Sequence, residues 1–265
     1  MIIKDKIKGF ISNLKLGFEF AKRDLQERYA GTNFGHLWLL ISPLITIFIY
    51  TVIFSDFMKM KMNIVNSEYA YSIYLIPGLI SWNFFSTVVL RLTGSVLDKS
   101  YLLKKVNIPM YVYYISIVLS ESVIYITGMV LGVVFLLLVH HHIGISFLIL
   151  PFLMFLVALF AFGLGVVFSL FTPFFKDFRE IINIILQLWF WLTPIIYVKE
   201  LIYSKYPYLV DYNPLYFFIE PMQTLFLYDK VLWSDIKAAF LIALVTLLAA
   251  SFLYKKLISE IKDII

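Results

Sequence analysis

The chain has 265 residues, of which 62% are hydrophobic and 15% are charged, and its formal net charge is +5. Soluble domains are about half apolar and about a quarter charged, so this composition excludes them and indicates an integral membrane protein of one domain. The absence of cysteine excludes disulfides, thiolate metal sites and cysteine nucleophiles. The small basic excess does not indicate nucleic-acid binding, because Lys and Arg in membrane proteins mark orientation.

Residues 1–33 predict an amphipathic helix over 7–29 that lies on the cytoplasmic membrane surface. Its apolar residues recur at steps of three and four, which is one face of a helix: Ile7, Phe10, Ile11, Leu14, Phe18, Ala21 and Leu25. A soluble helix packed on another protein is the alternative. Gly31 and Gly35 follow and permit a sharp turn into the first span.

Six stretches are apolar enough to cross the bilayer, which takes about 20 residues of helix. They are residues 34–55, 69–90, 110–139, 145–174, 181–198 and 237–254. Long uniform runs without strand alternation favour helices, because the backbone must satisfy its own hydrogen bonds in lipid. The expected fold is therefore all-α and integral to the membrane, with spans one to five in 34–198 and span six in 237–265.

The connection 199–236 is too long for a turn, and its segment 215–228 is apolar but too short to span. Asn213 and Pro214 precede this segment and favour a helix start. Segments of this length predict short re-entrant or outer-leaflet helices between spans five and six.

Most of the 22 Lys and Arg residues share one side of the membrane if the N-terminus is cytoplasmic. They lie in the N-terminal arm, the 91–109 loop, the 175–180 turn and the C-terminal tail: Lys4, Lys6, Lys8, Lys15, Lys22, Arg23, Arg28, Arg91, Lys99, Lys104, Lys105, Lys176, Arg179, Lys255, Lys256 and Lys262. The excess of positive charge inside predicts a multi-pass protein with both termini in the cytoplasm.

Motifs for catalysis are missing from the sequence. It has no GxxxxGK[ST] loop for ATP, no dinucleotide fingerprint and no Ser/His/Asp set. The run His140–His142 is a polar turn rather than a metal site, because adjacent histidines point in different directions on a helix. A membrane-embedded glycosyl- or prenyl-transferase needs an Asp-rich motif, and residues 98–105 hold one acidic residue. We therefore expect neither an enzyme nor a resident cofactor or metal.

Glu121 is the ionisable residue that lies deepest within a predicted span. Charges there are costly and face a partner or a cavity. An ion pair or hydrogen bond, with a tyrosine or with Arg91, is one interpretation, and a role in binding substrate or protons is the other.

Six aromatic residues, one of them Phe84, lie further into the predicted spans than the usual interfacial belt, and the other five are selected as candidates. They are Trp82, Phe85, Trp189, Phe190 and Trp191. Flat apolar faces with polar rims suit the stacking of sugar rings, so these residues are candidates for a glycan pathway. Helix packing explains each of them equally well.

Several motifs in order resemble the membrane subunit of ABC-2 type transporters that export polysaccharides. The stretch RDLQERYAGTNFGHLWLLISPL is similar to the family's RDL–x–x–RY, LG–x–LW and PL elements, with Phe34 in place of the usual Leu before Gly35. IPGLISWNFFSTVV, LLKKVNIP, FFKDFREIINIILQLWFWLTPIIY and YNPLYFFIEPMQ resemble later elements. Lys176 and Gln223 stand where the family has Arg.

The resemblance implies a permease in the bacterial cytoplasmic (inner) membrane. Two copies of the chain would form the pathway, and two separate ATPase subunits would bind ATP and Mg. The substrate would be a polyprenyl-pyrophosphate-linked glycan, with O antigen ahead of capsule and teichoic acid. An exporter of another lipid or drug is the alternative.

The resemblance also assigns residues to two sites. The ATPase-coupling loop would be Leu102, Leu103, Lys104, Lys105, Val106, Asn107 and Pro109. The entrance for the lipid pyrophosphate would include Arg23, Arg28 and Arg91, because arginine binds phosphate with two parallel hydrogen bonds. The alternative is that Arg23 and Arg28 only anchor the helix to anionic lipid.

Overall fold

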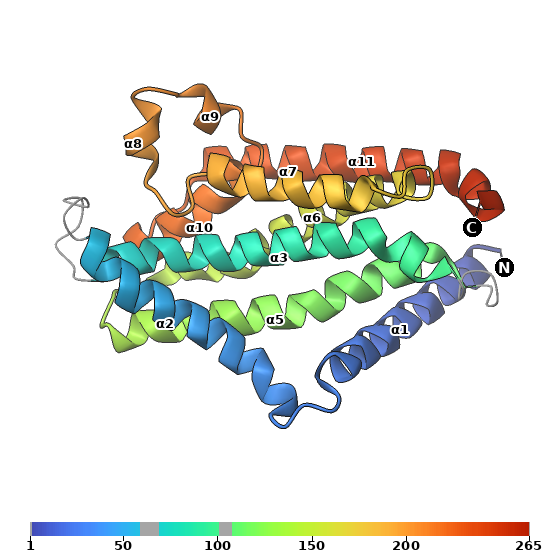
Figure 1. The fold of residues 1–265 in the computed structure, drawn as a ribbon, viewed down its shortest axis with the longest axis horizontal. Coiled ribbons are helices and arrows are strands. Elements are labelled where there is room, and N and C mark those ends of the chain that lie inside the picture. The colour runs from blue at the N-terminus through green and yellow to red at the C-terminus, as the bar shows by residue number, and fades with distance from the viewer. Residues whose placement is uncertain (1, 59–68, 101–107, 265) are drawn as a thin grey trace.

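The computed structural model describes residues 2–58, 69–100 and 108–264, and these residues form helices with no strand among them (Figure 1). Four stretches of helix are long and apolar enough to cross a membrane: Ala70–Asp98, Met110–Leu138, Ile145–Phe171 and Trp233–Ile261. They confirm the all-helical class and correspond to predicted spans two, three, four and six. The first and fifth spans, and with them the total of six, stay predictions.

The amphipathic N-terminal segment forms one helix, α1 (Ile2–Tyr29). α1 packs on α5 (Met110–Leu138) by a face beside the predicted apolar stripe. Gly17 lies against Ile115, and Phe20 stacks on Tyr113 with 5.2 Å between ring centroids. Ile11 and Phe18 of the stripe stay exposed. Ala21 of the stripe is buried, and Leu14 and Leu25 are half-buried. The helix therefore attaches to its own bundle and leaves part of its apolar stripe, Ile11 and Phe18, exposed.

A sharp elbow joins α1 to α2 (Trp38–Met58) through a short 3-10 turn, η1 (Gly35–Leu37). Gly31 and Gly35 have φ angles of +78° and +48°, a region that glycine adopts without the strain of a Cβ. The predicted turn is confirmed, and it sends α2 back along the bundle beside α3 (Ala70–Asp98) and α5 (Figure 1).

α3 is the central helix of the bundle and is buried along most of its length. It packs on α2, α5 and α6 (Leu150–Phe171), which follows a 3-10 turn, η2 (Ile145–Ile149). α3 continues to Asp98, eight residues beyond the predicted end of span two. The predicted start of the 91–109 loop is therefore wrong, because residues 91–98 belong to α3. The polar residues there pair with other helices instead of ending this one.

The last helix, α11 (Trp233–Ile264), packs along α6 and extends beyond predicted span six at both ends. The two chain ends lie at the same end of the bundle (Figure 1). Glycine permits the close approach of α6 to its neighbours. A Cβ on Gly163 would lie 3.0 Å from the Thr246 carbonyl carbon of α11, and one on Gly165 would lie 2.6 Å from Leu92 of α3.

α7 (Phe178–Leu192) ends six residues before the predicted end of span five. Thr193 is extended, because a residue that precedes proline avoids the helical region. The carbonyl groups released by this break are satisfied from neighbouring helices. The Tyr71 hydroxyl donates to Ile196 O at 2.7 Å, and the Gln223 amide donates to Pro194 O at 3.3 Å. Buried non-helical backbone needs such partners.

Three short helices follow α7: α8 (Lys199–Tyr203), α9 (Tyr208–Asp211) and α10 (Tyr216–Tyr228). α10 is mostly buried against α3, α6 and α11, so the predicted helix over 215–228 is present. Lys199 of α8 forms an ion pair with Glu220 of α10. Their position in the outer leaflet stays a prediction.

Replacement of Gly163 with valine should lower the thermal unfolding midpoint of the protein purified in detergent by several degrees. Added methyl groups would push α11 away from α6, and such overpacking costs about 1–3 kcal/mol. The matched control is Gly9→Val, because a Cβ at Gly9 meets nothing within 4 Å. Equal midpoints for the two variants would contradict the close packing of α6 on α11.

Candidate functional site

Glu121 of α5 is the centre of a buried charge cluster. The residue is only 4% exposed, and its carboxylate accepts hydrogen bonds from two arginines. Arg28 of α1 donates to both carboxylate oxygens, and Arg91 of α3 donates to Oε1 at 2.6 Å. The predicted ion pair between Glu121 and Arg91 is confirmed, and Arg28 is a second partner that sequence reasoning did not connect with it.

Asp24 completes the cluster from α1. Its Oδ1 accepts a hydrogen bond of 2.6 Å from Arg91 Nη2, and its Oδ2 lies 3.7 Å from Arg28 Nη2. Burial is the largest single influence and raises the pKa of Asp24. The hydrogen bonds from Arg91 and Ser120 and the charges of Arg91 and Arg28 together outweigh it, so the pKa of Asp24 lies below its usual value. The four side chains hold two positive and two negative charges, so the cluster is neutral while it ties α1 to α3 and α5.

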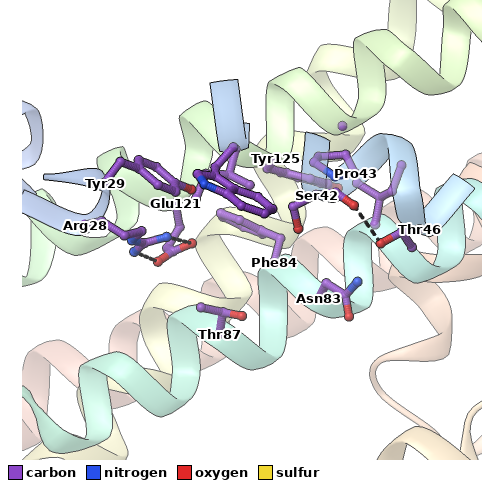
Figure 2. Close-up of a pocket in the computed structure, with 14 residues that line it drawn as sticks. Arg28, Tyr29, Ser42, Pro43, Thr46, Asn83, Phe84, Thr87, Glu121 and Tyr125 are labelled. Atoms are coloured by element: carbon purple, nitrogen blue, oxygen red, sulfur yellow. Dashed lines mark hydrogen bonds and ion pairs between the residues drawn. The ribbon is translucent and has the colours of Figure 1, made fainter. Parts of the chain in front are cut away.

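A cavity of about 320 Å³ opens beside this cluster, between the α1–α2 elbow, α3 and α5 (Figure 2). Arg28 and Glu121 lie at one end of it. Its lining residues are Arg28, Tyr29, Trp38, Ser42, Pro43, Thr46, Ile80, Asn83, Phe84, Thr87, Glu121, Ile124, Tyr125 and Gly128. The wall therefore changes from charged near the elbow to polar and aromatic further along α3.

Aromatic stacking gives this cavity a fixed wall. Phe84 and Tyr125 stack with 4.3 Å between ring centroids and 10° between planes. The Tyr125 hydroxyl lies 3.0 Å from Ser81 Oγ, which in turn donates to Pro77 O. The stack joins α3 to α5 and presents ring surface near Asn83 and Thr87.

A second cavity, of about 450 Å³, lies between α3 and α7. It is lined by Trp82, Ser86, Thr87, Leu90, Asn183, Leu186, Gln187, Phe190 and Trp191. Three of the five aromatic residues singled out in the sequence meet here. Trp82 and Phe190 lie 5.3 Å apart between centroids, and Trp191 is 5.4 Å from Phe190. Their role in a glycan pathway stays a prediction.

The other two aromatic candidates are packing residues in this structure. Phe85 is fully buried and stacks on Phe160, and Trp189 meets Phe85 edge-on at 5.6 Å. Trp189 Nε1 also donates to Asn213 Oδ1 at 2.9 Å, which ties α7 to the turn before α10. For these two residues the helix-packing interpretation describes what the structure shows.

The predicted entrance arginines take different positions. Arg28 lines the cavity, with 29% of its side chain exposed, whereas Arg91 lies behind it in the cluster and does not line it. Arg23 points elsewhere and lies 4.0 Å from Glu27, with both side chains largely exposed. An exposed pair of this kind contributes little. The structure therefore brings Arg28 and Arg91 together and leaves Arg23 apart.

The predicted coupling loop falls largely outside the described residues, which exclude 101–107. Of its members, Pro109 is described and forms the N-cap of α5. Asp24, Asn83 and Thr87 are site residues that the sequence analysis did not select. Asp24 belonged to the RDL–x–x–RY motif, and the polar Asn83 within an apolar span was an available signal.

The predicted histidine turn lies between α5 and η2. His142 Nδ1 is 3.5 Å from Asp229 Oδ2. Within the described ranges there is no group of three or more His, Cys, Asp or Glu side chains that could hold a metal ion.

Comparison with known proteins gives a consistent result. Residues 18–227 match the model of a family described as ABC-2 type transporter. An O-antigen export system permease protein RfbA of Klebsiella pneumoniae is 27% identical over 236 residues, which cover 89% of each chain. The protein of the same name from Myxococcus xanthus is 24% identical over 237 residues, covering 88% of this chain and 89% of its own.

Replacement of Glu121 with alanine should lower the free energy of unfolding by on the order of 3 kcal/mol, because it leaves two arginines without their buried partner. α1 should also become more susceptible to limited proteolysis. Both effects can be measured in detergent against Arg23→Ala, which removes an exposed pair and should change stability by less than about 1 kcal/mol. An α1 as protected in Glu121→Ala as in the unmodified protein would show that the cluster does not hold this helix.

Proposed function

Because this chain belongs to the ABC-2 type transporter family, we propose that it is the membrane subunit of an ABC transporter that exports O antigen. The observation that carries the choice of O antigen is the match to O-antigen export permeases over nearly nine-tenths of both chains. The helical bundle, its apolar spans and its polar cavities agree with a transport subunit.

ATP hydrolysis belongs to a partner in this proposal, because the sequence contains no phosphate-binding loop. Two ATPase subunits would bind two copies of this chain. The end of α3 at Asp98 and the start of α5 at Met110 lie at the end of the bundle that carries both termini (Figure 1). A coupling loop over 102–109 would therefore face the same side as the termini, which we place in the cytoplasm.

The pyrophosphate head of a polyprenyl-linked substrate would bind at Arg28. This guanidinium is the cation that lines the cavity, and it lies at the elbow where α1 leaves the bundle. Glu121 Oε1 accepts from both Arg28 and Arg91, so Arg28 can be shared with a phosphate while Arg91 still neutralises Glu121. The cluster thus offers one arginine without leaving a buried carboxylate unpaired.

The glycan would continue from the headgroup toward the cavity between α3 and α7. Trp82, Phe190 and Trp191 present ring faces there, next to the amides of Asn183 and Gln187. Aromatic faces with hydrogen-bonding rims match sugar rings, which have C–H faces and hydroxyl edges. Export of a polyprenyl-linked polysaccharide uses both cavities, whereas a small apolar drug needs neither the arginine nor the amides.

Purified alone in detergent, the chain should neither bind nor hydrolyse ATP. Hydrolysis should appear when a separate ATPase subunit encoded beside it is co-purified, because the sequence lacks the nucleotide site. Nucleotide binding is measured by fluorescence of an ATP analogue, and hydrolysis by phosphate release. The ATPase subunit alone is the control for its own basal rate. Tight nucleotide binding by this chain alone would contradict the proposal.

Arg28→Lys should weaken binding of undecaprenyl pyrophosphate to the reconstituted complex by about tenfold. Lysine keeps the charge but loses the forked geometry that pairs with phosphate oxygens. Arg91→Lys is the matched control, because Arg91 is in the same cluster and does not line the cavity. Affinity is measured by stimulation of ATP hydrolysis as the lipid is titrated. Equal losses in both variants would mean that Arg28 acts through the cluster alone.

A further inference from the structure

One face of α3 is polar although the rest of the helix is buried in apolar surroundings. From Ala70 to Phe85 every residue except Asn83 is buried, and Ser86 and Thr87 follow as half-exposed residues. The side chains of Asn83 and Thr87 form no hydrogen bond with any residue that the structure describes. Polar groups at membrane depth face a partner or a water-filled cavity. Asn83, Ser86 and Thr87 are called the polar strip below.

The polar strip connects the two cavities. Asn83 lines the cavity beside the charge cluster, Ser86 lines the cavity between α3 and α7, and Thr87 lines both. Asn83, Thr87 and Arg91 are spaced four residues apart, so they follow one another along the same face of α3. Figure 2 shows Asn83 and Thr87 on the side of α3 that borders the first cavity. A ligand group held at Arg28 therefore shares its cavity with Asn83 and Thr87, and Thr87 also borders the second cavity. The polar strip and the two cavities that it borders are called the path below.

The residues that line this path indicate which kind of ligand fits there. Apart from Arg28 and Glu121, the residues that line the two cavities carry no ionisable carboxylate, ammonium or guanidinium group. A second phosphate would find no cation there, and a polyprenyl chain would leave the amides of Asn83 and Asn183 without partners. Aromatic rings lie on either side of the strip at Trp82 and Phe84. Hydroxyls and amides bordered by rings fit an uncharged, polyhydroxylated ligand.

We propose that the polar strip binds the first sugars of the lipid-linked glycan, those next to the pyrophosphate, while Arg28 holds the headgroup. This inference rests on the proposed function and adds a sugar-binding segment to it. The side chains that donate and accept are Asn83 and Thr87, and Thr87 is the point at which the glycan passes from the first cavity to the second.

Photo-crosslinking in living cells tests where the sugars lie. p-Benzoylphenylalanine placed at position 83 or 87 should give adducts that stain for glycan in cells that assemble the polysaccharide. The same adducts should form in cells blocked after the first few sugars, and none should form in cells that make no glycan. Position 126 is the control, because Ile126 lies on the exposed face of α5. Adducts that require the long glycan, or that join two copies of this chain, would overturn the proposal.

Substitution separates the sugar contact from the headgroup contact. Thr87→Val and Asn83→Leu should each weaken binding of a short lipid-linked glycan about tenfold, which is the loss of one well-made hydrogen bond in a dry site. Binding of bare undecaprenyl pyrophosphate should not change. Thr93→Val is the matched control on α3, because the Thr93 hydroxyl bonds only to Val89 O of its own helix.

The outcomes distinguish the inference from the function on which it rests. Equal weakening for both lipids, or no weakening for either, would show that the strip does not bind sugar, although the protein is still an exporter. If the unmodified complex binds neither lipid and exports no glycan, the proposed function itself is wrong.

Discussion

A carboxylate buried at membrane depth has to be neutralised, and in this protein that requirement determines how three helices meet. Glu121 of α5 is buried beside two cations, and removing a charge from water without such partners costs several kcal/mol even after relaxation. Arg91 reaches it from α3 and Arg28 from the last turn of α1. Arg28 sits one residue before the end of α1. Its bond to Glu121 therefore holds the end of α1 against α5, at the point where the elbow begins.

The elbow in turn shapes the cavity. Gly31 and Gly35 take positive φ angles directly after the anchored end of α1, and α2 then returns with Trp38 and Pro43 on the cavity wall. α1 also bonds to α3 through Asp24 and Arg91, so α1 cannot shift along the bundle without breaking a hydrogen bond to the central helix. The cavity beside the elbow and the end of α3 are thus connected by one neutral group of four charges.

Sequence reasoning predicted the parts of this arrangement that depend on local pattern. Apolar runs located the four long spans, and the cost of a charge in lipid indicated that Glu121 would need Arg91. Sequence reasoning failed where contacts between helices determine the structure. α3 runs past Leu90 because Arg91 pairs with Glu121 and because Leu92 and Val96 are fully buried. Sequence reasoning could not separate packing aromatics from cavity-lining aromatics, because α7 carries rings on both faces. Trp189 packs in the core, whereas Trp191 is 64% exposed.

The order of chemical groups along α3 supports the proposal that the headgroup and the first sugars of the glycan bind to one surface. Arg91 is in the cluster that neutralises Glu121, Thr87 is one turn further, and Asn83 is one turn beyond that, beside the Phe84–Tyr125 stack. A lipid-linked glycan carries its groups in the same order, with an anionic link followed by neutral rings. The neutral cluster attracts no anion over long range, so a headgroup bound as proposed would compete with Glu121 at contact distance for Arg28. In the proposed binding mode, sugars that gain hydrogen bonds further along α3 would add to the free energy of that competition, so the cluster would discriminate against anions that lack them.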